Sequence, residues 1–133
     1  MTTMRALAVV TLIVASGWAL HATGAQRPGI TRTDLQRHDL SVPGREVVQV
    51  RVDFAPGATF GKHSHPGEEI VYVIEGRLEY QVGNERPVTL EAGEVLFIPA
   101  RAIHSARNVG SVNGAELATY VVEKGKPLLE IVK

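Results

Sequence analysis

The strictest constraint on the fold is a series of short runs in which apolar residues occupy every second position. The run 46–54 follows this period and ends at Pro56-Gly57. A period of two marks a half-buried strand, and Gly or Pro breaks mark turns. Comparable apolar runs lie at 69–75, 78–82, 88–90, 95–98 and 117–122. Short strands with turn signals about every eight to twelve residues are typical of an antiparallel sandwich or barrel, so we predict an all-β fold.

Length and composition fit one such domain. The chain has 133 residues, 44% of them hydrophobic, which is enough to bury a single core. Thirteen Gly and seven Pro suit many short strands better than a few long helices. We find no internal repeat, and we predict a single domain.

The first 25 residues read as a targeting segment. One positive side chain lies in 1–5, an apolar stretch fills 6–20, and small residues occupy 22–25. This order is typical of a signal peptide, with cleavage after Ala25 or, alternatively, after Gly24. An uncleaved anchor helix is the rival interpretation, but the apolar stretch is shorter than the ~20 residues that span a bilayer. We therefore predict an exported protein, periplasmic or secreted, with no stable membrane anchor after cleavage.

Residues 26–45 are polar and mixed, and residues 46–133 hold the predicted barrel. We interpret 26–45 as an N-terminal arm that pairs with a sheet edge. His38 lies in this arm and is expected to be exposed, with the alternative that it reaches the barrel of a partner molecule.

Charge and cysteine content exclude several classes of function. Fourteen basic and fourteen acidic residues balance without a run of one sign, so nucleic acid and anionic membranes are not predicted partners. The chain has no Cys, which excludes disulfides and thiolate metal sites. Any metal ion must therefore bind nitrogen and oxygen ligands.

The segment His63-Ser64-His65 points to such a site. Side chains two apart on an extended strand share a face, and Pro66 favours extended backbone at His65. Glu69 can return beside the two imidazoles and offer a carboxylate, whereas strand alternation turns Glu68 to the solvent. A lone His would more simply be a surface or core residue, and it is the combination with Glu69 that favours metal binding.

The spacing in this region resembles the two motifs of the cupin superfamily, and more narrowly the small, exported, type-2 members that resemble quercetinases. The first motif matches at Gly57, His63, His65, Glu69 and Gly76, and the second at Gly93, Pro99, His104 and Asn108, with Arg101 where the family has Gly. The resemblance implies a jelly-roll barrel that holds one divalent transition metal ion on His63, His65, Glu69 and His104. Mn, Fe, Co, Ni, Cu and Zn all suit such ligands. It also implies a homodimer formed by exchange of N-terminal strands.

The resemblance further implies a function for the site. The first hypothesis is a metal-dependent dioxygenase acting on a small hydroxylated or enolisable compound, with Glu69 as a general base. A redox-neutral isomerase, cyclase or lyase for a sugar acid and a non-enzymatic periplasmic module that binds a ligand or metal remain alternatives. We expect the pocket to be lined by Val71, Val73, Phe97, Tyr120, Arg101 and Arg107.

Overall fold

The computed structural model describes residues 27–133, so the predicted signal peptide and both of its cleavage sites lie outside the described residues. The described part of the chain consists of strands, turns and loops. The strands are β1 (Ile30–Asp39), β2 (Arg45–Phe54), β3 (Thr59–Ser64), β4 (Gly67–Glu75), β5 (Arg77–Val82), β6 (Val88–Glu91), β7 (Val95–Ile98), β8 (His104–Asn108), β9 (Gly114–Glu123) and β10 (Glu130–Ile131). Between residues 27 and 133 there is no helix long and apolar enough to cross a membrane.

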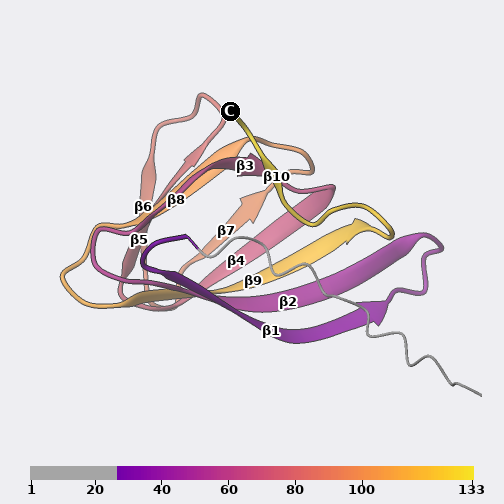
Figure 1. Ribbon diagram of the computed structural model, residues 1–133, viewed down its shortest axis with the longest axis horizontal. Coiled ribbons are helices and arrows are strands. Elements are labelled where there is room, and N and C mark those ends of the chain that lie inside the picture. The colour runs from indigo at the N-terminus through magenta and orange to yellow at the C-terminus, as the bar shows by residue number, and fades with distance from the viewer. Residues whose placement is uncertain (1–26) are drawn as a thin grey trace, which may run out of the picture.

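The strands form two five-stranded antiparallel sheets that face each other, as Figure 1 shows. One sheet has the order β1-β2-β9-β4-β7 and the other β10-β3-β8-β5-β6. The chain passes from one sheet to the other between β3 and β4, so His65-Pro66 is a crossing point between sheets rather than a hairpin turn. The prediction of an all-β jelly-roll barrel is confirmed.

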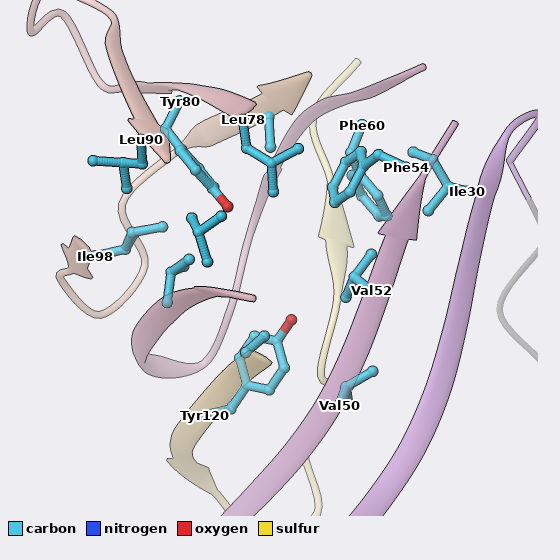
Figure 2. Close-up of a cluster of buried hydrophobic side chains, with 14 of the residues drawn as sticks. Ile30, Val50, Val52, Phe54, Phe60, Leu78, Tyr80, Leu90, Ile98 and Tyr120 are labelled. Carbon is cyan, nitrogen blue, oxygen red and sulfur yellow. The ribbon is translucent and has the colours of Figure 1, made fainter. Parts of the chain in front are cut away.

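The core fills the space between the sheets. Alternate residues of β2 are buried along its whole length, and β9 alternates in the same way from Glu116 onward. Figure 2 shows the hydroxyl groups of Tyr80 and Tyr120 directed into this interior. Each fully buried Val, Leu or Phe contributes about 1.5–3 kcal/mol, so this interior packing is the main source of stability.

The N-terminal arm contains a strand that the alternation did not reveal. Residues of β1 pair with β2 from Ile30↔Phe54 to Asp39↔Glu46, and β1 forms the outer edge of its sheet (Figure 1). Ile30 is the only buried residue of this strand, so backbone hydrogen bonds rather than an apolar face hold it in place. His38 is exposed. Exchange of this strand between two protomers stays a prediction.

Arg101 shows how the turn before β8 tolerates a residue other than Gly. Its φ is 63°, in the left-handed region that favours Gly. Its backbone N–H donates to the carbonyl of His65 at 3.1 Å, and its guanidinium donates to Glu123 at 2.9 Å. These two contacts offset part of the conformational cost and keep the turn that leads to His104.

Candidate metal centre

Four side chains meet between the sheets at the end of the barrel where β3 crosses to β4. His63 lies on β3, His65 at the crossing, Glu69 on β4 and His104 at the start of β8. All four are buried, and one ligand atom from each lies within 4.8 Å of the others. The structure therefore brings together all four predicted ligands.

Strand register explains this convergence. His63 is paired directly with His104 across β3 and β8, which places the two imidazoles side by side on one sheet. Glu69 is 3% exposed and faces them from the other sheet, whereas Glu68 is half-buried on the opposite face of β4. Gly67, the first residue of β4, lies so close to β9 that a Cβ there would be 2.0 Å from the carbonyl oxygen of Val121.

Backbone carbonyls fix the orientation of all three imidazoles. The Nδ1 atoms of His63, His65 and His104 lie 2.7, 2.5 and 2.9 Å from the carbonyl oxygens of residues 61, 128 and 102, respectively. A carbonyl oxygen only accepts hydrogen bonds, so each Nδ1 acts as a donor and Nε2 is the ring nitrogen left free to face the site. The fold thus aims three Nε2 atoms at one region.

The donor atoms left in this region fit a cation. Glu69 Oε2 lies 3.2 Å from His65 Nε2 and 3.0 Å from His104 Nε2. These three atoms are buried without a hydrogen-bond partner in the described structure. Two ligands bound to one ion at ~2.0–2.2 Å are themselves about 3 Å apart, as these atoms are. Three imidazoles and a carboxylate without thiolates form a donor set suited to a divalent transition metal ion.

Electrostatics keep the site in the form that a metal needs. Burial, followed by the charge of His104, lowers the pKa of His63 to about 3, so this ring stays neutral. Burial alone would raise the pKa of Glu69, but the contacts with His104 and His65 outweigh it and lower the pKa to about 2. The site therefore offers a neutral imidazole and an ionised carboxylate at neutral pH without first losing a proton from either group.

A cavity of about 10 Å³ lies against His63, Glu69 and His104, and its lining corrects part of the predicted pocket. Tyr120 lines it as predicted, and Val71 and Val73 are buried in the core without lining it. Phe97 was assigned to the pocket wrongly: it is 60% exposed, because Ile98 rather than Phe97 pairs with Glu69 and takes the inward phase.

The two predicted pocket arginines also lie elsewhere. The side chains of Arg101 and Arg107 are 65% and 57% exposed and bind Glu123 and Glu79, respectively. Both arginines are therefore surface residues, and neither lines the cavity.

Sequence reasoning missed a second buried carboxyl in the cavity wall. Glu116 is 5% exposed and accepts a hydrogen bond from the hydroxyl of Tyr80. Burial and then the charge of Glu69 raise the pKa of Glu116 to about 8. Its signal was present in the alternation, since residues 116, 118, 120 and 122 share the inward phase of β9, but the predicted strand began at residue 117. The other missed wall residues are Arg32, Val52, Phe54, Phe60, Tyr80 and Ala106.

Comparisons with known proteins agree with this architecture. A family model described as a cupin domain matches residues 50–123. The chain is similar to Germin-like protein subfamily 2 member 2 of Arabidopsis thaliana, at 33% identity over 87 residues, which cover 59% of this chain and 40% of that protein. It is similar to the oxalate-binding protein of Thermotoga maritima, at 33% identity over 73 residues, which cover 54% of this chain and 60% of that protein.

A solved structure, recombinant oxalate oxidase in complex with glycolate, is also similar. It gives a TM-score of 0.62 at 27% identity and covers 77% of this chain and 55% of that chain. The present chain matches between 40% and 60% of the length of these three proteins.

Proposed function

This chain belongs to the cupin family, and from that premise we propose that it is a metal-dependent enzyme that uses dioxygen to oxidise a small, oxygen-rich acid. The observation that carries the proposal is the set of three buried donor atoms, His65 Nε2, Glu69 Oε2 and His104 Nε2, that point at one place without a partner. The similarity to an oxalate oxidase structure that holds glycolate supports the choice of chemistry and of substrate class.

The chain's own residues divide the work at this site. A bound divalent ion would supply Lewis acidity and, if redox-active, electron transfer with dioxygen. His63, His65, His104 and Glu69 would hold it, and the phenol of Tyr80 and the carboxyl of Glu116, which line the same cavity, would contact the ligand.

Proton transfer is better assigned to Glu116 than to Glu69. A general base works best with a pKa near the working pH. The pKa of Glu69 is lowered to about 2, so its carboxylate is a weak base, whereas that of Glu116 is raised to about 8. We therefore propose Glu116 as the acid-base group, in place of the role first given to Glu69.

The size of the cavity favours small substrates. A volume of about 10 Å³ holds about one water molecule or one ion, so even a small ligand requires some movement of the wall. Flavonols would need a much larger rearrangement than two-carbon acids. The proposed substrate class is accordingly a small hydroxy or dicarboxylic acid.

A second candidate is a binding module for such an acid, without turnover. The similarity to the oxalate-binding protein of Thermotoga maritima favours it over other non-enzymatic roles. The same four ligands and the same cavity would serve it.

Oxygen consumption separates these candidates. Purified protein is loaded in turn with manganese, iron, nickel, copper or zinc and mixed with glycolate or oxalate in an oxygen electrode. We expect consumption with at least one redox-active metal and none with zinc, and its loss in Glu116→Gln and His104→Ala. Absence of consumption with every metal, together with tight acid binding, would support the binding module; a changed acid without oxygen uptake would support redox-neutral chemistry.

We also propose that the protein is exported and forms a homodimer. In the described structure, Ile70 and Tyr72 of β4 and Val95 and Phe97 of β7 are exposed and paired across the strands, which makes an apolar outer face. Such a face is better covered than left in water. Light scattering of the mature protein measures its mass, and a monomeric mass would refute the dimer. Export is tested separately, by N-terminal sequencing of the protein from its natural compartment, which shows whether the chain is cleaved after Ala25.

A further inference from the structure

The wall of the metal cavity contains one cation, Arg32 of β1. Its side chain lines the cavity and the residue is half-buried. No Asp or Glu oxygen of residues 27–133 lies within 4.0 Å of it, and residues 1–26 contain neither Asp nor Glu. An arginine beside a buried site without a carboxylate partner is available to an anion from outside.

Strand register directs Arg32 inward. Arg32 pairs with Val52, and Val52 pairs with Glu116, so three neighbouring strands place these residues in one row. The guanidinium carbon lies 6.0 Å from the ring centre of Tyr120. Arg32 therefore lies over the same space that Glu116 and Tyr120 border.

Glu116 does not neutralise this cation. Burial and the charge of Glu69 raise the pKa of Glu116 to about 8, and the opposing effect of Arg32 is too weak to reverse this. The carboxyl is thus largely protonated at neutral pH, and its hydrogen bond is with Tyr80. Arg32 therefore has no ion pair with Glu116 in the cavity wall.

Arg32 is also the wall residue that can move most easily. Val52, Phe54, Tyr80 and Tyr120 are at most 2% exposed and are fixed in the core. Arg32 belongs to an edge strand paired on one side only, and its long side chain can rotate without opening the sheet. Since the cavity has room for little more than an ion, this rotation is the least costly way to admit a ligand.

We propose that Arg32 closes the metal cavity and, when it turns aside, binds the anionic group of an incoming small carboxylate. The planar guanidinium matches a carboxylate through two parallel hydrogen bonds. The inference rests on the proposed function, because it assumes that a small acid enters this site, and it adds the residue that selects for its charge.

The test compares two probes of nearly equal shape, glycolate and its neutral amide, glycolamide. Binding of each to the Mn²⁺-loaded protein is measured by calorimetry for the wild type, Arg32→Gln and Arg32→Lys. The control is Arg37→Gln, which removes the same charge from the same strand at a residue already paired with Glu46. Metal content and thermal midpoint are recorded for each variant.

We expect Arg32→Gln to weaken glycolate binding by about tenfold or more and glycolamide binding by less than about twofold, since hydrogen bonds to charged groups are worth about 1.5–3 kcal/mol. Arg32→Lys should restore part of the loss, and Arg37→Gln should change neither probe. Equal weakening of both probes, unchanged glycolate binding in Arg32→Gln, or a metal-loaded wild type that binds neither probe would overturn the inference. The proposed function fails separately, when the metal-loaded wild type consumes no oxygen while its preference for glycolate persists.

Discussion

Glu116→Gln should change how the stability of the metal-free protein depends on pH. The pKa of Glu116 rises from an ordinary 4.5 to about 8 on folding, so between these values the folded chain keeps a proton that the unfolded chain releases. Stability from this group is therefore full below pH 4.5 and is lost as the pH rises toward 8. The rise from 4.5 to about 8 corresponds to at most about 5 kcal/mol, a large share of the about 5–15 kcal/mol that stabilises an ordinary domain.

The substitution isolates this group. A Gln side chain has nearly the same shape and can still accept the hydrogen bond from Tyr80, but it does not titrate. Urea unfolding of both proteins in EDTA, at several values from pH 5 to pH 8.5, gives the difference in free energy of unfolding. His63 acts in the opposite direction, because its pKa is lowered to about 3, but it is common to both proteins and cancels in the difference.

We expect the wild type to lose stability relative to Glu116→Gln as the pH rises, by several kcal/mol over this range. The same comparison with Mn²⁺ bound should give a smaller slope, because a cation beside Glu69 offsets the charge that helps to raise the pKa of Glu116. A difference that stays constant from pH 5 to pH 8.5 would show that Glu116 ionises normally, and the assignment of a neutral second carboxyl would have to be abandoned.

Three further results are expected. Free metal at about 100 times its Kd should add about 2.7 kcal/mol to the stability of the folded protein. Removal of the metal with EDTA should therefore lower the thermal midpoint by roughly 10–20 °C. Equal midpoints in a thermal shift assay would argue against the site. Arg101→Gly should raise the free energy of unfolding in urea by about 0.5–1 kcal/mol, because relief of the left-handed φ of 63° exceeds the loss of an exposed ion pair with Glu123; a decrease would contradict this account. Gly67→Ala should lower the free energy of unfolding by at least about 2 kcal/mol, because the new Cβ would lie 2.0 Å from the carbonyl oxygen of Val121. Gly44→Ala, where nothing lies within 4 Å of the new Cβ, should lower it by about 1 kcal/mol through backbone strain alone. Similar losses in both variants would show that crowding at Gly67 is unimportant.

The all-β class and three of the ligands, His63, His65 and Glu69, could be predicted from local rules, whereas the jelly-roll barrel and His104 came from the resemblance to the cupin motifs. The alternation of apolar residues located most of the strands. The alternation of faces within β4 favoured Glu69 over Glu68 as the ligand, and the burial of Glu69 agrees with that choice. The strand β8 escaped detection because its polar residues do not read as apolar alternation, although His104 itself was identified from the motif.

The cavity wall could not be predicted to the same degree, because some of its residues come from strands in which the sequence does not show which side chains face inward. Arg32 lies in a polar strand with a single buried residue, so no apolar period says which side chains turn inward. Phe97 was misplaced because β7 has only four residues and apolar side chains on both faces. In both places the pairing partner, known only from the structure, decides the phase.

The carbonyl groups that hold the three imidazoles have a consequence for how such a centre can change over time. Every residue type supplies a carbonyl oxygen, so positions 61, 102 and 128 can exchange their side chains without releasing His63, His104 or His65, as long as the backbone path is kept. At the metal centre itself, chemistry therefore fixes the identity of the four donor side chains and leaves these three supporting side chains free. The rest of the barrel can diverge toward new substrates around a centre whose geometry is inherited with the fold.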